Sequence, residues 1–148
     1  MKEIGLKYEE LTGKIIGCAM RVHSKMGNGF PEVIYQRCLA IEFAKTKIDF
    51  VREMEMEIFY DAELVGLRRV DFFVENTIMV ELKAKTEIEP AHLNQTINYL
   101  EAYNMEVGLL INFGAPSLQF HRFTNKKFNP TLNRASNRNL QNTNPGIS

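Results

Sequence analysis

The sequence predicts one α+β domain, a mixed α/β arrangement in which helices flank a central mixed β-sheet. Two observations indicate this class. Apolar residues recur at helical spacing near the N-terminus and again after Pro90, while residues 51–83 show the two-residue alternation of strands. At 148 residues, of which 45% are hydrophobic, the chain can build one core but is too short for two ordinary domains.

Two helices are predicted near the N-terminus. The first covers residues 8–26, and its core-facing residues are Leu11, Ile15, Cys18, Ala19 and Val22. Gly27-Asn28-Gly29 ends this helix, because glycine and asparagine tolerate the left-handed conformation of a helix C-terminus. Pro31 suits the first position of a second helix that runs to about Lys45. The expected buried stripe of the second helix is Ile34, Cys38 and Ile41.

The remaining elements are predicted to be five strands and one helix. The strands cover residues 51–59, 67–74, 78–83, 107–113 and 118–123. A helix from Pro90 to about Asn104 lies between the third and fourth strands. The expected order is therefore α-α-β-β-β-α-β-β.

The charges and asparagines divide the chain in two. Residues 125–148 are asparagine-rich and carry only basic charges, from Lys126, Lys127, Arg134 and Arg138. The net charge is zero, so residues 1–124 are net negative by four. We expect a domain over residues 1–124 and a flexible basic tail over 125–148. An acidic domain argues against broad nucleic-acid affinity but suits a carboxylate site that holds a divalent metal.

No apolar run approaches the roughly 18 residues that span a bilayer, and the N-terminus shows no apolar signal core. The sequence therefore predicts a cytoplasmic protein without membrane association.

The most informative stretch is the pair of strands around Glu75-Asn76-Thr77. Its even-numbered residues are all apolar: Val70, Phe72, Val74, Ile78, Val80 and Leu82. Its odd-numbered residues are mostly ionisable: Arg69, Asp71, Phe73, Met79, Glu81 and Lys83. Because side chains alternate between faces along a strand, one face is expected to be buried and the other to gather the charges.

A three-residue loop pairs Asp71 directly opposite Glu81, with Cβ atoms about 4.5–5.5 Å apart. Like charges repel at that distance, and a divalent cation between them removes the repulsion. Lys83 shares the face and suits the holding of an attacking water. The alternative interpretation is a solvated face with an ordinary Lys–Glu pair.

Two helices offer further polar groups. Gln95 and Tyr99 are four residues apart, so they share a helix face, and Gln95 suits contact with a phosphate or a metal-bound water. A partly exposed helix face explains the same pattern. Glu32 falls in the first turn of the second helix, where the helix dipole stabilises a carboxylate whatever its function.

Several ordered motifs resemble the GxxExxY protein family. They are Gly29-Phe-Pro-Glu32-Val-Ile-Tyr35, Val80-Glu-Leu-Lys-Ala and Gly108-Leu-Leu-Ile-Asn-Phe-Gly. That family is similar in pattern to the RecB-like branch of the PD-(D/E)XK nuclease superfamily. Over roughly residues 8–124 the resemblance implies a restriction-endonuclease-like core.

The resemblance also implies roles for individual residues. The metal ligands are Asp71, Glu81, the Leu82 carbonyl and Glu32 (directly or through water), with Mg²⁺ or Mn²⁺ as the ion. The catalytic set is Lys83, Glu81, Asp71 and Glu32, and the substrate-binding set is Gln95, Tyr99 and Tyr35. The proline of the superfamily's name is replaced by Val70, and the iron–sulfur cysteines of some RecB-like members are missing.

Two classes of function remain open. The first is a metal-dependent nuclease that hydrolyses DNA or RNA through an activated water. The second is a non-catalytic module that keeps the nuclease fold for binding, or a subunit whose partner supplies the nucleic-acid surface. A protein partner or a second copy of the chain fits this second class, because a small, neutral protein offers little surface for gripping long nucleic acid.

Overall fold

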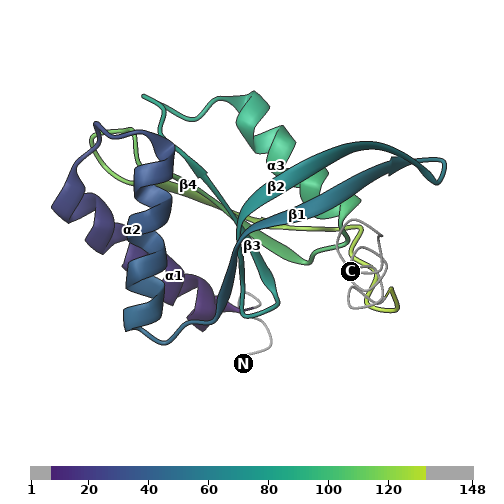
Figure 1. The fold of residues 1–148 in the computed structure, drawn as a ribbon, viewed down its shortest axis with the longest axis horizontal. Coiled ribbons are helices and arrows are strands. Elements are labelled where there is room, and N and C mark those ends of the chain that lie inside the picture. The colour runs from purple at the N-terminus through teal and green to yellow at the C-terminus, as the bar shows by residue number, and fades with distance from the viewer. Residues whose placement is uncertain (1–7, 133–148) are drawn as a thin grey trace.

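The computed structural model describes residues 8–132 (Figure 1). The elements are α1 (Glu9–Met26), α2 (Glu32–Lys45), β1 (Phe50–Tyr60), β2 (Glu63–Val74), β3 (Ile78–Lys83), α3 (Pro90–Ala102), β4 (Val107–Asn112) and β5 (Gln119–Thr124). This is the predicted order, and the α+β class is confirmed. None of these helices is long and apolar enough to cross a membrane.

The five strands form one mixed sheet in the order β1-β2-β3-β4-β5. Neighbouring strands are antiparallel except β3 and β4, which run parallel because α3 connects them as a crossover. One face of the sheet packs against α1 and α2, and the other packs against α3, so each face has its own apolar cluster. The larger cluster lies under α1 and α2.

The structure confirms the predicted core-facing residues of α1. Ile15, Cys18, Ala19 and Val22 are buried, and Leu11 packs against them. At the helix end Gly27 has a φ of +77°, which a residue with a Cβ adopts only with strain.

The predicted stripe of α2 was wrong in its direction, although Cys38 is half-buried and packs against the larger cluster. The core-facing residues are Tyr35, Leu39 and Phe43, whereas Ile41 is 57% exposed. The helix is rotated by about one position because this orientation buries its two aromatic rings. Tyr35 stacks on Phe113, and Phe43 packs on two further phenylalanines of the sheet.

β1 and β2 continue past the rest of the sheet as a two-stranded ribbon that projects from the layered body (Figure 1). We call residues 57–67 the arm. Its exposed apolar side chains are Phe59, Tyr60, Leu64, Val65 and Leu67. Its charged residues are the acids Glu57, Asp61 and Glu63, without a lysine or arginine.

The start of the predicted tail lies against the domain. Asn125 is buried, and its Nδ2 donates to the carbonyls of Leu100 and Met105 at 3.1 and 3.0 Å. Asn104 and Asn129 are also linked, by hydrogen bonds of 2.9 Å. Residues 125–132 therefore cap the end of α3, while the rest of the predicted tail lies outside the described residues.

Candidate metal-binding and catalytic site

The β2–β3 hairpin has the predicted loop and register. Glu75, Asn76 and Thr77 connect the strands, and the pairs run from Val74–Ile78 to Phe72–Val80. The ladder ends there, one pair before Asp71 and Glu81. The Asp71 carboxylate then replaces the backbone of β2 as the partner of β3, because its Oδ2 accepts the Leu82 N–H at 2.8 Å. Asp71 is thus fixed at the point where the two strands separate.

The strand alternation breaks at Asp71, which corrects the predicted faces. The pair Glu53–Asp71 is missing from the β1–β2 ladder, and Glu53 has a φ of +55°. As a result Phe72 lies in the cluster under α1 and α2, whereas Val70 lies in the cluster under α3. The prediction that Arg69 shares the carboxylate face was therefore wrong, and Arg68 is on that face instead.

Asp71 is positioned by a residue that the sequence analysis missed. Buried Gln36 donates from Nε2 to Asp71 Oδ1 at 2.8 Å. Burial raises the pKa of Asp71, while the hydrogen bonds from Leu82 and Gln36 lower it. The signal for Gln36 was its spacing of four from Glu32, which puts both residues on one face of α2.

Glu81 is the most deeply buried carboxylate of the group, at 2% exposure. Its Oε1 accepts a hydrogen bond of 2.6 Å from Arg68 Nη2, while its Oε2 is buried and has no hydrogen-bond partner among residues 8–132. Burial and the negative charge of Asp71 raise the pKa of Glu81 to about 8, although Arg68 and Lys83 oppose the shift. A buried oxygen without a partner is costly unless a ligand fills the position.

Tyr99 is linked to the Glu81 carboxylate by Arg68, which contacts both side chains. The Arg68 guanidinium sits 4.8 Å from the centroid of the Tyr99 ring, and Tyr99 stacks on Tyr103. Burial raises the pKa of Tyr103 to about 12. Gln95, one turn earlier on α3, is exposed. The two predicted α3 residues are therefore placed differently, since Tyr99 supports the carboxylate pair and Gln95 faces solvent.

Glu32 begins α2 at the rim of the site. Burial raises the pKa of its carboxyl, and the charge of Asp71 adds to this shift. In the part of the chain that the structure describes, no three Asp, Glu, His or Cys side chains are close enough to form a ready metal cage. Asp71 and Glu81 are the central pair, and Glu32 contributes charge from farther away.

Lys83 ends β3, two residues after Glu81, and is half-buried. The chain beyond it is clamped by Asn112, whose side chain accepts the Lys85 N–H at 2.8 Å and donates to the Lys85 carbonyl at 2.9 Å. Gly114 lies against the same segment, and a Cβ there would meet the Lys85 backbone at 2.4 Å. These contacts fix the path of the chain that carries Lys83.

Tyr35 has a structural position. The side chain is fully buried, its hydroxyl donates to the Gly27 carbonyl at 2.5 Å, and it accepts the Phe30 N–H at 3.2 Å. The tyrosine of the GxxExxY motif therefore braces the α1–α2 connection, and we leave it out of the proposed substrate site.

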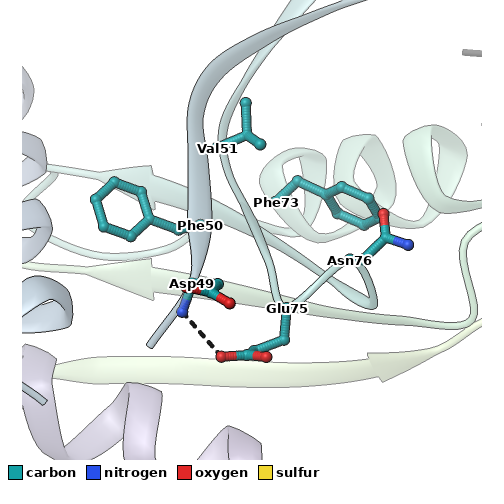
Figure 2. A pocket seen from close by; sticks show the side chains of 6 residues that line it. All are labelled: Asp49, Phe50, Val51, Phe73, Glu75 and Asn76. Atoms are coloured by element: carbon teal, nitrogen blue, oxygen red, sulfur yellow. Dashed lines mark hydrogen bonds between the residues drawn. The ribbon is translucent and has the colours of Figure 1, made fainter. Parts of the chain in front are cut away.

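A pocket of about 310 Å³ lies elsewhere, at the opposite end of the β2–β3 hairpin (Figure 2). It is lined by Asp49, Phe50, Val51, Phe73, Glu75 and Asn76. β3 begins beside it and reaches Lys83 roughly 15 Å farther on. The pocket therefore shares no residue with the carboxylate site.

The site residues fit a divalent cation. Mg²⁺ and Mn²⁺ prefer carboxylate and carbonyl oxygens, and Glu81 Oε2 is a buried oxygen that lacks a partner within the described residues. The family model of the PD-(D/E)XK nuclease superfamily matches residues 9–123. The chain belongs to that superfamily. The residues that the sequence predicts for its motif, Asp71, Glu81 and Lys83, lie close to Arg68, whose charge acts on both acids.

One solved structure similar to this PD-(D/E)XK protein is described as "Crystal structure of SSO0001". The two are 18% identical, with a TM-score of 0.48 over 74% of this chain. The match spans 58% of the other chain, so this protein corresponds to somewhat more than half of it. The comparison with curated proteins found no match.

Proposed function

We propose that this PD-(D/E)XK protein is a Mg²⁺- or Mn²⁺-dependent nuclease that hydrolyses phosphodiester bonds of DNA or RNA. One observation carries the proposal. The buried carboxylate of Glu81 keeps an oxygen without a partner among the described residues, and burial together with the negative charge of Asp71 raises the pKa of this carboxyl. Stability alone does not favour that arrangement, whereas a divalent cation satisfies both acids.

The chain's own residues divide the work. Asp71 and Glu81 hold the ion, with the Leu82 carbonyl as a further ligand and Glu32 bound directly or through water. A bound ion supplies Lewis acidity toward the phosphate and lowers the pKa of an attacking water. Lys83 orients that water and neutralises charge that develops on the phosphate. Gln95 faces solvent from α3 and contacts the substrate backbone, and Tyr99 supports the site from the same helix.

The finer assignment is to GxxExxY proteins and the RecB-like branch of the superfamily. The ordered motifs Gly29-Phe-Pro-Glu32-Val-Ile-Tyr35 and Val80-Glu-Leu-Lys-Ala support it. We also propose a cytoplasmic protein, and the proposed nuclease activity makes nucleic acid its principal partner.

A second candidate function is a binding module or a subunit of a nucleic-acid-processing complex. The arm favours it, because five large apolar side chains there are more than half exposed. The arm is acidic, so it suits a protein partner or a second copy of the chain better than nucleic acid.

The test is hydrolysis of labelled single- and double-stranded DNA and RNA with Mg²⁺ or Mn²⁺. We expect Glu81→Ala to lower the rate at least about 100-fold, because the ion loses its most buried ligand. Lys83→Ala is expected to lose turnover while keeping metal binding. Glu63→Gln, an exposed carboxylate of the arm, is the matched control and is expected to cleave like the wild type.

The outcomes separate the candidates. Cleavage by the wild type and Glu63→Gln alone supports the nuclease and begins to define its substrate. Folded proteins that all fail to cleave favour the binding module. Equal rates for wild type and Glu81→Ala, in preparations free of other nucleases, would contradict the assignment of Glu81.

A further inference from the structure

The ion pair between Arg68 and Glu81 uses only one of the two carboxylate oxygens. Arg68 Nη2 donates to Glu81 Oε1 at 2.6 Å. Arg68 Nε and Glu81 Oε2 are both buried, and neither has a partner within residues 8–132. Strong arginine–carboxylate pairs are frequently bidentate, with two parallel hydrogen bonds. Here the second carboxylate oxygen stays available for another ligand.

Arg68 is held from its other side by an aromatic ring. Its guanidinium lies 4.8 Å from the centroid of Tyr99, which in turn stacks on Tyr103. An aromatic face attracts the charge and orients the planar guanidinium without using its N–H groups. The side chain is 28% exposed, so it is partly shielded from water. A fixed positive charge therefore stands beside the candidate metal ligand.

The charge of Arg68 acts on the whole site. Burial raises the pKa values of Glu32, Asp71 and Glu81, and the charge of Arg68, like that of Lys83, opposes this rise. Lys83 belongs to the catalytic motif, but Arg68 comes from β2 and has no place in that motif. In the described residues, Arg68 is also the cation whose hydrogen bond reaches Glu81.

Resting on the proposed metal site, we propose that Arg68 is a built-in counter-cation, which holds the Glu81 carboxylate when no divalent ion is bound and weakens the binding of that ion. Two cations on one carboxylate repel each other. The repulsion persists even when the ion replaces a proton on Glu81, since the site still gains one positive charge. Arg68 acts through Glu81 and is a positioning residue that sets how readily the site loads.

The test is the dissociation constant of Mn²⁺, measured without nucleic acid by electron paramagnetic resonance and calorimetry at about pH 8.5, where protons compete least for Glu81. We expect Arg68→Gln to bind Mn²⁺ at least about fivefold more tightly than the wild type, because one positive charge is removed. Arg68→Lys keeps the charge and is expected within about twofold of the wild type. An equal gain in both variants would exclude charge as the cause.

The neighbouring arginine is a matched control. Arg69 is 68% exposed, and its nearest carboxylates, Glu53 and Glu55, lie 3.9 and 4.0 Å away on the other face of the ribbon. Arg69→Gln removes the same charge one residue away and is expected within about twofold of the wild type, because water screens exposed charges. If Arg68→Gln does not fold, Arg68→Met, which keeps the apolar stem, takes its place.

Different results would overturn the counter-cation role of Arg68 and the metal site itself. Unchanged or weaker Mn²⁺ binding by Arg68→Gln, with wild-type binding that depends on Glu81, overturns the counter-cation alone. Failure of both proteins to bind Mn²⁺, or equal binding by Glu81→Gln, overturns the metal site as well. Binding by Arg68→Gln that the wild type lacks supports the inference.

Discussion

The two ends of the β1–β2 ribbon share backbone pairing but have different surroundings. At the inner end Phe72, Phe73 and Val74 are buried between helices on both faces of the sheet. At the outer end, in the arm, Leu64, Val65 and Leu67 are each more than half exposed. Both ends are rich in apolar residues, so composition does not decide the difference. Helices that cover the sheet make its inner end a place where a carboxylate is desolvated.

The same difference separates two neighbouring arginines. Arg68 points toward α3 and bonds a carboxylate that is 2% exposed. Arg69 points the other way and meets glutamates at 3.9 and 4.0 Å in solvent. A charge in a covered, low-dielectric place acts strongly on its neighbours, whereas an exposed charge is screened. Position relative to the helices, not residue type, gives Arg68 its influence.

The largest expected contrast is in the free energy of unfolding. Phe72→Ala at the inner end is expected to cost about 3–5 kcal/mol, because Phe72 is fully buried against two other rings. Leu67→Ala in the arm is expected to cost less than about 0.5 kcal/mol, because its side chain already contacts water. Urea denaturation of both variants measures the contrast. A similar loss of unfolding free energy in both variants would mean that another molecule covers the arm in solution.

Two glycines offer a smaller contrast. Gly114→Ala is expected to cost about 2–3 kcal/mol, since its Cβ would lie 2.4 Å from backbone atoms of Lys85. Gly66→Ala in the arm meets its nearest atom, on Ile58, at 3.9 Å and is expected to change stability by less than about 0.5 kcal/mol. Thermal and urea unfolding check both values. Full stability of Gly114→Ala would contradict the close packing beside the Lys83 segment.

The pH dependence of stability gives the smallest contrast. The folded-state pKa of Glu81 is about 8, above its ordinary 4.5, so between these values the folded protein binds more protons than the unfolded chain. In EDTA the free energy of unfolding should therefore fall as pH rises through this window, by at most about 1.4 kcal/mol for each pH unit. Glu81→Gln should flatten the slope, and Glu63→Gln should not. Parallel slopes for all three proteins would count against a buried, ionisable Glu81.

The fold was largely predictable because its signals are local. The two-residue alternation predicted β2 and β3, and Pro90 predicted the start of α3. The loop of three residues, Glu75, Asn76 and Thr77, predicted the hairpin register. The prediction of the α2 face failed because Ile34, Cys38 and Ile41 also form an apolar stripe. Helical periodicity does not say which of two neighbouring stripes a sheet will cover.

The site was predictable in part. The motif and the register predict Asp71, Glu81 and Lys83 as candidate residues, and in the structure Asp71 and Glu81 lie just beyond the last pair of the β2–β3 ladder. Gln36 was missed, although it is four residues from Glu32. Tyr35 was expected at the substrate, yet its side chain is buried. The sequence does not distinguish a tyrosine whose hydroxyl supports a turn from one whose hydroxyl contacts a ligand.

The sequence by itself determined the order of the elements, the β2–β3 register and the identity of the acids and lysine, because each depends on spacing within a short stretch. Only the tertiary structure decided that Arg68 and not Arg69 faces Glu81, and that Tyr99 holds it there. That choice depends on the break in the ladder between Glu53 and Asp71 and on the packing of Tyr99 against Arg68, which join segments 18 and 31 residues apart. Alternation predicts a face only while the strand stays regular, and burial of a charge depends on what covers that face.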